Sequence, residues 1–394
     1  MEKVKLGDVS KLINGDRGKN YPSQADITEE GEIPFVNAGH LNGREIDFSE
    51  MNYISQDKYD NLRSGKFQEG DILYCLRGSL GKKAIVSNDV NGAIASSLVI
   101  IRPDKEKVDG EYLMFALDSP AIKEQLVKAN NGSSQPNLSA SSVREYQVEL
   151  PNISVQKEVV EKLIKVRNII DCRRKELQLL DSLIKARFVE MFGNPVINEK
   201  RWRQKSLGEI TTKIGSGATP KGGKGAYQEE GITLIRSMNV HNGLFEYKEL
   251  AHISDEQATK LDNVVIEEND VLLNITGASV ARSCVVPSKI LPARVNQHVC
   301  IIRCKKCINP EFLNKLLIDD NYQDLLWSIA GAGATREAIT KQQVENLQII
   351  MPPIELQIEF MRFCNQVNKS KFAVQKTLEQ TQTLFDSLMQ KYFG

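Results

Sequence analysis

Three cysteines lie close together in the second half of the sequence, at Cys300, Cys304 and Cys307, where they could offer thiolates to a metal ion. A structural zinc site takes four ligands, however, and no second Cys or His pair lies nearby. The seven cysteines of the chain are an odd number, which is typical of free thiols in a reducing compartment. We therefore expect no metal site.

No pattern typical of an active site or a cofactor site is found elsewhere. The glycine-rich string at residues 217–225 lacks the spacing of a phosphate-binding loop and the hydroxyl residue after its lysine. No carboxylate pair with a following lysine indicates a nuclease, and the Asn/Asp-Pro-Pro-aromatic string of amino-methyltransferases is absent from the sequence. The four histidines, at positions 40, 241, 252 and 298, are interpreted as surface or loop residues. The sequence thus predicts a chain that is not an enzyme and holds no cofactor.

The remaining candidates lie in polar, basic and glycine-rich loops at matching places in the two halves of the chain. Arg and Lys are the residue types that contact phosphates, whereas Asn, Gln and Ser hydrogen-bond base edges, and glycine lets a backbone approach a duplex closely. The loops span residues 14–21, 37–44, 77–83 and 130–137 in the first half, and 215–227, 236–242, 276–282, 294–297 and 331–336 in the second. Ordinary solvated loops have a similar composition, so it is the duplication that favours a nucleic-acid surface.

Within these loops we single out the side chains that could contact double-stranded DNA. The candidates for phosphate or guanine contacts are Arg17, Lys19, Arg77, Lys82, Lys221, Lys224, Arg236, Arg282 and Arg336. The candidates for base edges are Asn37, Gln135, Asn239, Asn296 and Gln297. Asn20, Tyr21 and Tyr227 complete the set, the two tyrosines because their rings could stack or pack against a sugar.

Length and composition limit what can carry these loops. A chain of 394 residues exceeds what one hydrophobic core usually supports, so two or more domains are expected. Its 51 basic residues balance 51 acidic ones, which excludes a uniformly basic protein and leaves any nucleic-acid surface local. No stretch is long and apolar enough to span a bilayer, and the first residues do not resemble a signal peptide. We therefore expect a cytoplasmic protein without membrane contact.

An internal repeat spans almost the whole chain. Leu-Gly-Asp at residues 6–8 recurs as Leu-Gly-Glu at 207–209, and Phe-Gly at 192–193 recurs at 393–394, an offset of 201 in both cases. Between these points the offset drifts only to 199, so the gaps are small and compensating. A unit of this length can fold as a domain by itself. The repeat predicts a pseudo-two-fold molecule, with a duplication that has no symmetric function as the alternative.

Each copy is expected to contain a β-rich domain followed by a long helix. Short apolar runs between Gly, Asn, Asp and Pro, as at residues 71–76, 97–101, 271–275 and 298–302, predict strands, and a shorter helix is expected at 110–128 and at 310–329. The fold class is therefore α+β. We expect two similar β-rich domains at residues 1–150 and 202–351, spacer helices at 151–193 and 352–394, and a linker at 194–201.

Both long helices carry an apolar stripe with alternating spacings of three and four residues. Its positions are Val159, Leu163, Val166, Ile170, Leu177, Leu180 and Ile184 in the first helix, and Phe360, Val367, Val374, Leu378, Phe385 and Leu388 in the second. A helix this amphipathic must bury its stripe, and the nearest available partner is its twin. Because a whole domain separates the two helices in sequence, they can pair as an antiparallel coiled coil. Packing onto their own domains or onto other subunits is the alternative.

Several motifs then show a family resemblance. They are Trp202-Arg203 before the Leu-Gly-Glu-Ile of residues 207–210, the Gly-Ala-Thr-Pro of 217–220, the Asn-Asp-Val-Leu of 269–272, Asn296-Gln297, and Pro352-Pro353 with Gln357 opening the long helix. Together they resemble the specificity subunits of Type I restriction-modification systems, over both halves of the chain. The first half fits less closely, because residues 18–22 replace Gly-x-Thr-Pro and Ser96-Ser97 stand where Asn296-Gln297 do.

The resemblance implies two target-recognition domains, each of which reads one half of an interrupted DNA sequence. The long helices would then act as a ruler and as the docking surface for two methyltransferase (M) subunits, joined by restriction (R) subunits. S-adenosylmethionine, ATP and Mg would bind to those partners, and the assembled complex would be a site-specific deoxyribonuclease and adenine-N6 DNA methyltransferase. The alternatives are a specificity subunit of a methylation-only system, a scaffold or decoy of the same fold that does not read DNA, and an enzyme that also methylates or cuts.

Overall fold

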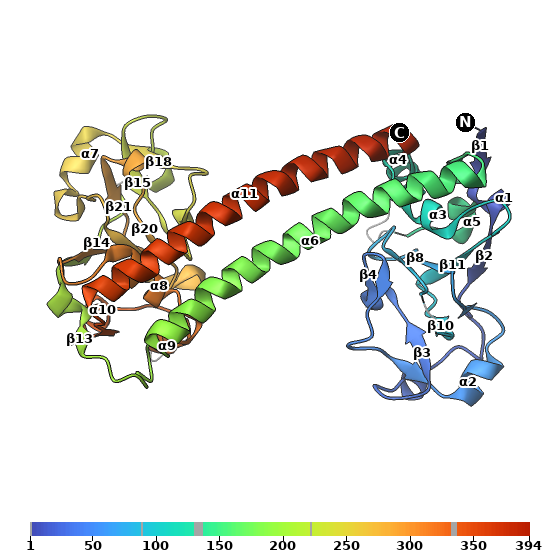
Figure 1. Cartoon of the computed structure of the whole chain (residues 1–394), viewed down its shortest axis with the longest axis horizontal. Coiled ribbons are helices and arrows are strands. Elements are labelled where there is room, and N and C mark those ends of the chain that lie inside the picture. Colours follow the sequence, from blue (N-terminus) through green and yellow to red (C-terminus); the bar gives the residue numbers. More distant parts are fainter. Residues whose placement is uncertain (1, 88–89, 130–136, 221–222, 332–336) are drawn as a thin grey trace. The chain divides into compact units, whose positions relative to one another are not determined.

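The computed structural model describes residues 2–87, 90–129, 137–220, 223–331 and 337–394 (Figure 1). The chain forms two compact units, of which the first comprises Met1–Arg174 with Lys376–Gly394 and the second comprises Lys175–Gln375. Each unit therefore contains one β-rich domain and the adjoining ends of both long helices. The sequence analysis separated the helices from the domains. The compact units instead divide within the helices, because the helix ends pack into the domain cores.

The first unit is built around a four-stranded antiparallel sheet with the order β2-β11-β8-β9. A second, mixed sheet has the order β6-β3-β10-β7, in which β10 runs parallel to β3. The strands are β1 (Glu2–Lys5), β2 (Ser10–Asn14), β3 (Ile33–Val36), β4 (Leu41–Asn42), β5 (Glu45–Ile46), β6 (Tyr53–Ile54), β7 (Lys66–Phe67), β8 (Ile72–Cys75), β9 (Lys83–Ile85), β10 (Gly92–Ile94), β11 (Leu98–Pro103) and β12 (Gln147–Leu150). The helices of this domain are α1 (Leu6–Val9), α2 (Gln56–Asn61), α3 (Gly110–Ala116), α4 (Pro120–Ala129) and α5 (Ala140–Arg144).

The second unit repeats this topology. Its four-stranded sheet has the order β14-β22-β19-β20, and β15 pairs with β18 and, in parallel, with β21. Its strands are β13 (Gln204–Ser206), β14 (Thr211–Ser216), β15 (Ile232–Ile235), β16 (Val240–His241), β17 (Leu244–Phe245), β18 (Ala251–Ile253), β19 (Val271–Asn274), β20 (Ser283–Val285), β21 (Ala293–Val295), β22 (Val299–Cys304) and β23 (Gln348–Ile350). Its helices are α7 (Asp255–Thr259), α8 (Pro310–Leu317), α9 (Asp320–Gly331) and α10 (Lys341–Glu345). The internal repeat and the four strands expected from apolar runs are confirmed.

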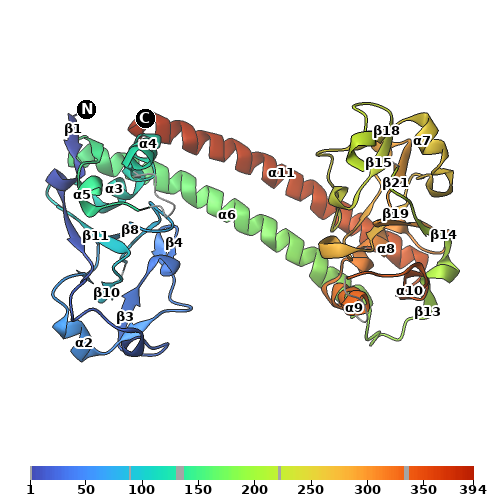
Figure 2. The same ribbon diagram turned by 180° about the vertical axis from the view of Figure 1, so that it is seen from behind.

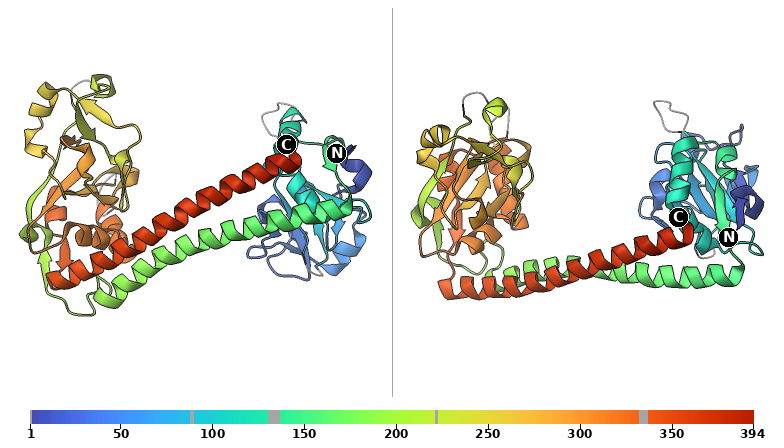
Figure 3. Two further views of the ribbon diagram at one scale, coloured as in Figure 1. Left: turned by 45° about the horizontal axis from the view of Figure 1, so that its top comes forward. Right: turned by 90° about the horizontal axis from the view of Figure 1, so that it is seen from above.

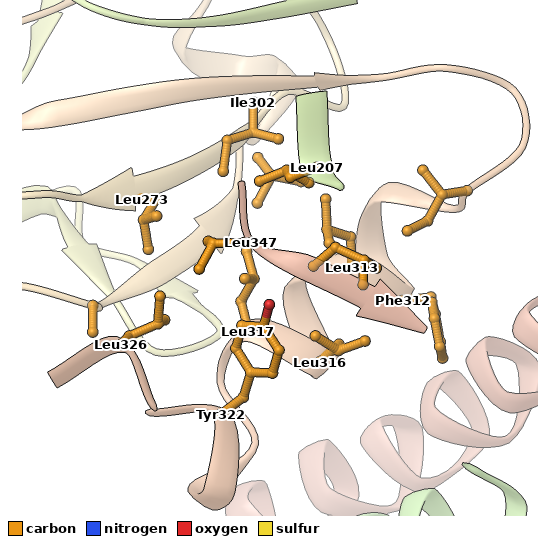
Figure 4. Packing of buried hydrophobic residues seen from close by; sticks show 14 of the residues in the cluster. Leu207, Leu273, Ile302, Phe312, Leu313, Leu316, Leu317, Tyr322, Leu326 and Leu347 are labelled. Atoms are coloured by element: carbon orange, nitrogen blue, oxygen red, sulfur yellow. The ribbon is translucent and has the colours of Figure 1, made fainter. Parts of the chain in front are cut away.

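The central sheet of each domain is buried on both faces, which explains why its strands read as continuous apolar runs. In the second unit, Leu273 and Ile302 face a core that contains α8 and the ends of the long helices, and Figure 4 shows these residues packed with Leu313 of α8. Leu272 and Ile301, one position away on the same strands, face a second core on the other side of the sheet. Alternate side chains of a strand thus serve two cores.

The single shorter helix expected in each domain is in fact two helices. In the first unit the chain breaks between α3 and α4, where Pro120 opens the second helix. A proline fits the first turn of a helix but not its interior. In the second unit the break lies between α8 and α9, and the Asp319 side chain accepts a hydrogen bond from the backbone N–H of Asn321 there.

The two long helices, α6 (Ile153–Phe192) and α11 (Ile354–Phe393), have 40 residues each. In the first unit, Val159 near the start of α6 shares a core with Phe393 at the end of α11. In the second unit, Phe188 near the end of α6 shares a core with Phe360 near the start of α11, with ring centroids 5.6 Å apart. The helices therefore run antiparallel in each unit, as the sequence predicts. In Figures 2 and 3 each domain contacts the helix pair through α3, α4 and α5 or through α8, α9 and α10.

Every position of the apolar stripe is buried or half-buried. The buried ones are Val159, Leu163, Ile170, Ile184, Phe360, Val367 and Val374, and the half-buried ones are Val166, Leu177, Leu180, Leu378, Phe385 and Leu388. Two ion pairs flank the stripe in the second unit, Lys371 with Asp181 and Arg187 with Glu359.

A fully buried glutamine ties the start of each long helix to its domain. Gln156 accepts a hydrogen bond from the backbone N–H of Asp109 at 2.8 Å and donates to the carbonyl of Pro151 at 2.7 Å. Gln357 makes the same two contacts, with Asn309 at 2.9 Å and Pro352 at 2.9 Å. The repeat therefore has the same side-chain anchor at the start of both long helices.

Candidate nucleic-acid interface

A cleft of 580 Å³ in the first unit brings together two of the arginines that the sequence singled out. Arg17 follows β2 and Arg77 follows β8, and both side chains are exposed. Arg144, at the end of α5, completes a set of three cations in this cleft. Asn137 and Ser139 add neutral hydrogen-bonding groups to its lining. Three exposed guanidinium groups in one cleft are suited to phosphate oxygens.

Arg17 is held in place by the residue before it. The Asp16 carboxylate accepts hydrogen bonds from the backbone N–H groups of Gly18 at 2.8 Å and Arg63 at 2.9 Å. These donors hold the pKa of Asp16 below its ordinary value. The Arg17 guanidinium in turn donates to the carbonyl of Ser96 at 3.5 Å. Sequence reasoning found Arg17 and Arg77 but missed Arg144, because Arg144 lies in a helix outside the loops.

Several other candidates in the first unit have partners within the protein. Lys82 donates to the carbonyl of Ala38 at 2.9 Å, and the Asn37 side chain caps the following turn by accepting from the backbone N–H of Gly39. Asn20 donates to the carbonyl of Asn61, and the Tyr21 hydroxyl accepts from the backbone N–H of Ser96. These contacts give the four side chains roles in positioning loops. Lys19 is exposed, and Gln135 lies outside the described residues.

In the second unit a relay of four polar side chains crosses the corresponding surface. Thr219 donates to Gln297 Oε1, Gln297 Nε2 contacts His298 Nε2 at 3.0 Å, and His298 Nδ1 contacts the Thr276 hydroxyl. Arg282 lines a cleft of 350 Å³ together with Thr276 and His298. Sequence reasoning found Gln297 and Arg282 but interpreted His298 as a surface or loop residue. Its position next to Gln297 was the available signal.

Gly217 allows this relay to form. A Cβ atom at this position would lie 1.8 Å from the carbonyl oxygen of Val295, so only glycine lets the loop approach so closely. The backbone N–H of Gly217 donates to the carbonyl of Asn296 at 3.1 Å. This approach brings Thr219, two residues later, to Gln297, which gives the Gly-Ala-Thr-Pro motif a physical reason.

Two candidates for base edges are buried and serve the fold instead. Asn239 is fully buried, accepts from the backbone N–H of Arg236 and donates to the carbonyls of Glu246 and Lys248. Its amide therefore has no access to a base. Asn296 is also buried, and its side-chain oxygen accepts from the backbone N–H of His298 at 3.0 Å. Both residues position the loops that carry other candidates.

Of the remaining candidates in the second unit, some make contacts within their own domain and the others lie outside the described residues. Arg236 lies over the Tyr227 ring at 5.5 Å and donates to the carbonyl of Glu249, so both side chains are engaged with their own domain. Lys221 and Arg336 lie outside the described residues, as does the side chain of Lys224.

Within the described residues, no group of three or more His, Cys, Asp or Glu side chains could hold a metal ion. Cys300 is buried, Cys304 half-buried and Cys307 exposed. Burial raises the pKa values of Cys300 and Cys304 to about 12, which keeps both thiols protonated. Among the helices of the described chain, none is long and apolar enough to cross a membrane.

Comparison with known proteins identifies the family. The model of the Type I restriction modification DNA specificity domain matches twice, over residues 1–181 and 199–381. The chain belongs to this family. It is 22% identical over 379 residues to the Type I restriction enzyme MjaVIII specificity subunit of Methanocaldococcus jannaschii, which covers 90% of this chain and 83% of that protein.

Two solved structures share the fold. The S subunit of a Type I restriction-modification system from M. genitalium matches with a TM-score of 0.59 at 14% identity, over 100% of this chain and 96% of that one. A chain from a study of assembly and conformational transition in the type I R-M system matches with a TM-score of 0.62 at 20% identity, over 100% and 97% of the two chains. We therefore name the β-rich parts of the two units the first and second recognition domains.

Hydrogen-bond register shows which residues of the two recognition domains correspond. The backbone N–H of Leu76 donates to Ser97 O, and that of Ile275 donates to His298 O, so Ser97 matches His298. This corrects the sequence alignment by one position, since Ser96-Ser97 match Gln297-His298 and not Asn296-Gln297. The sheet pairs Asn14 with Val99 and Ser216 with Cys300, which makes Gly15, and not Gly18, the counterpart of Gly217.

Matched positions in and beside the two clefts carry different side chains in the two recognition domains. The pairs are Arg17 with Thr219, Ser96 with Gln297, Ser97 with His298, Arg77 with Thr276, and Arg144 with Glu345. The first two pairs are in contact in both domains, but Arg17 donates to the backbone carbonyl of Ser96 whereas Thr219 donates to the side-chain oxygen of Gln297. The framework is therefore shared while the chemistry it displays is not.

A buried ion pair joins the same two strands in each recognition domain. Asp71 is almost fully buried and accepts two hydrogen bonds from Arg102, each of 2.7 Å. Asp270 is fully buried and accepts two from Arg303, each of 2.8 Å. Hydrogen bonding to the aspartates raises the pKa values of both arginines. These pairs join the start of β8 to β11 and the start of β19 to β22.

Proposed function

We propose that this chain selects the DNA target of a Type I restriction-modification complex by binding one part of an interrupted sequence with each recognition domain. The observation that carries this proposal is that matched loops of the two domains display different polar side chains. Arg17, Arg77 and Arg144 line a cleft in the first domain, whereas Thr276, which corresponds to Arg77, lines a cleft with Arg282 and His298 in the second. Equal frameworks with different side chains are what a protein needs to read two different half-sites. The catalytic steps belong to partner subunits.

Phosphate contacts and base contacts are divided among the described side chains. Arg17, Arg77 and Arg144 suit phosphates or guanine, since guanidinium groups bind both. Gln297, Thr276 and Arg282 suit base edges in the major groove. Residues such as Lys82, Asn37 and Asn239 act indirectly, because their polar groups hold the loops that carry the contacts.

The partners that we propose are two methyltransferase subunits and restriction subunits, with S-adenosylmethionine, ATP and Mg bound to those partners. Apolar side chains remain exposed on the outer faces of the long helices and favour a docking role for them. Leu183 on α6 and Leu384 on α11 are 47% and 51% exposed at equivalent places in the repeat, and Phe372 on α11 is 74% exposed. Two equivalent apolar positions fit two copies of one partner.

We also propose that the helices fix the gap between the two half-sites. A helix of 40 residues rises about 60 Å, which is long compared with the roughly 34 Å of one DNA turn. Deleting equal numbers of turns from α6 and α11 should shorten the unspecified gap in the target and leave both half-sites unchanged.

Mapping methylated adenines across the genome, in cells with and without this gene, tests the proposal. The expected result is one bipartite motif that depends on the gene. A single uninterrupted motif would contradict the proposed function. A complex that assembles with methyltransferase subunits but modifies no motif would instead indicate a scaffold or decoy. Phage restriction in the same cells separates a restriction system from a methylation-only one.

A further inference from the structure

The polar relay of the second recognition domain has a fixed direction of donation. Thr219 donates its hydroxyl hydrogen to Gln297 Oε1, so the Gln297 amide nitrogen is the atom that contacts His298 Nε2. An amide nitrogen can only donate, which makes His298 Nε2 an acceptor and places the ring hydrogen on Nδ1. His298 Nδ1 then donates to the hydroxyl oxygen of Thr276.

This direction determines what the relay offers to a ligand. Because the Thr276 oxygen receives a hydrogen bond from His298, its own hydrogen remains available for donation. Gln297 likewise keeps its second amide hydrogen, and its side chain is exposed. The half-buried Arg282 lines the same 350 Å³ cleft as Thr276 and adds guanidinium donors. The relay and Arg282 therefore present several hydrogen-bond donors, and the Arg282 guanidinium has no acceptor, whereas the Thr276 oxygen keeps one free lone pair.

We propose that this cleft recognises the major-groove edge of a guanine in the half-site bound by the second recognition domain, an inference that rests on the proposed function. Guanine presents two acceptors, N7 and O6, in the major groove. Adenine presents an N6 donor and cytosine an N4 donor, neither of which can pair with the Arg282 guanidinium. Thymine presents one acceptor, O4, and a methyl group in place of the two acceptors of guanine. An unpaired buried donor is costly, so the cleft discriminates against adenine and cytosine.

A DNA phosphate also offers acceptors only, and the composition of the cleft favours the base. Phosphates are bound chiefly by cations, whereas Arg282 is the single cation among the described residues that line this cleft, and Thr276 and Gln297 carry no charge. A relay of four side chains also fixes the position of each donor, which a base edge requires and a phosphate does not. The first recognition domain has Arg17 and Arg77 at the positions of Thr219 and Thr276, and it therefore lacks this arrangement.

The first experiment combines the whole chain and its methyltransferase partner with substitutions in the cleft. Thr276→Val removes the hydroxyl at nearly constant shape, and Arg282→Lys keeps the charge but removes the planar fork. We expect both to relax the methylated motif at one guanine of one half-site by about 10-fold to 100-fold and to leave the other half-site unchanged. Thr276→Ser keeps a donor and should retain the guanine. Thr259→Val, an exposed threonine on α7, is the matched control.

A second experiment tests the acceptor on the base itself. Once the motif is mapped, duplexes carrying 7-deazaguanine at that position keep the base pair but lack the N7 acceptor. We expect the complex with the unchanged chain to bind such duplexes about 10-fold more weakly, and the Arg282→Lys complex to show no further weakening.

The possible outcomes separate this inference from the proposed function. An equal drop in affinity for every sequence, with the motif intact, would assign the cleft to a phosphate and overturn the inference alone. Relaxation at an adenine, a cytosine or a thymine would also overturn it. Absence of any bipartite motif with the unchanged chain would contradict the proposed function itself.

Discussion

The two recognition domains share one framework and differ in the charge of what it displays. The described cleft of the first domain has three arginines, at positions 17, 77 and 144, where the second has two threonines and a glutamate. The second domain uses a hydrogen-bonded relay that includes Gln297 and His298. The order of the strands in the central sheet and the buried aspartate–arginine pair are shared by both domains. Selectivity in this fold can therefore change without any change in the strands.

This difference has a physical consequence for DNA binding. Arginine contacts to phosphates release condensed counterions, so binding by the first domain should depend steeply on salt. Neutral contacts to base edges release few ions, so the second domain should contribute more to discrimination than to the salt dependence. The comparison predicts that equivalent substitutions in the two domains have unequal effects.

The largest expected effect is on folding. After Asp71→Asn, the Arg102 guanidinium faces a neutral amide and the backbone carbonyl of Lys66, and it has lost its carboxylate partner. After Asp270→Asn, the Arg303 guanidinium still forms an ion pair with Glu267. Removing one partner of a buried pair costs about 3–5 kcal/mol. We expect Asp71→Asn to lower the free energy of unfolding by about this amount and Asp270→Asn by less, as measured by urea denaturation. Equal decreases would show that Glu267 adds nothing.

The next effect concerns the three arginines of the first cleft. Replacing Arg17, Arg77 and Arg144 together by alanine should weaken binding of the complex to its target by at least about 100-fold at moderate salt. The slope of log affinity against log salt should fall by about 0.9 for each phosphate that the variant no longer binds. The same three positions of the second domain changed to alanine, at Thr219, Thr276 and Glu345, serve as the matched comparison. They should alter sequence preference while the salt slope stays the same.

The sequence allowed much of the architecture to be predicted, because the repeat and the apolar stripe are patterns that extend over many residues. The pairing of α6 and α11 follows from the heptad spacing, and its antiparallel sense follows from the whole domain that separates the two helices in sequence. The structure confirms both in each unit. The strands were visible as apolar runs because both faces of each central sheet are buried. The division of each shorter helix into two was missed, because in the first domain it depends on a single proline.

The candidate site was harder to predict because a residue type does not show where its polar atoms point. Asn239 and Gln297 look alike as amides in loops, yet the first is a fully buried cap and the second is exposed. The sequence alignment matched Ser96 to Asn296, which is wrong by one position, because the residue identities do not show where the small compensating gaps between the two copies lie. Hydrogen-bond register, which only a structure supplies, fixes that match.

A smaller effect separates the two glycines that bring the loops close to the sheet. A Cβ atom at Gly217 would lie 1.8 Å from Val295 O, whereas one at Gly15 would lie 3.0 Å from Ala95 O. Gly217→Ala should therefore move the loop that carries Thr219 and reduce discrimination at the second half-site by about 10-fold. Gly15→Ala needs a shift of only a few tenths of an ångström and should change binding much less. Methylation rates on duplexes with a single mismatch measure the effect of each substitution. A larger effect of Gly15→Ala than of Gly217→Ala would show that the closeness of the loop to the sheet does not determine discrimination.

The smallest effect concerns the loop that holds Arg17. The Asp16 carboxylate accepts from two backbone N–H groups, which depresses its pKa, so the charged form stabilises the folded loop. For a depressed carboxyl pKa, this stabilisation is complete above the unfolded value of 3.8 and disappears as the pH falls through the lower, folded value. Asp16→Asn keeps one oxygen acceptor of the two, so we expect binding to weaken only about 3-fold at neutral pH. Hydrogen exchange at the amides of Gly18 and Arg63 should become faster in this variant, and unchanged protection at both amides would show that the carboxylate does not hold the loop.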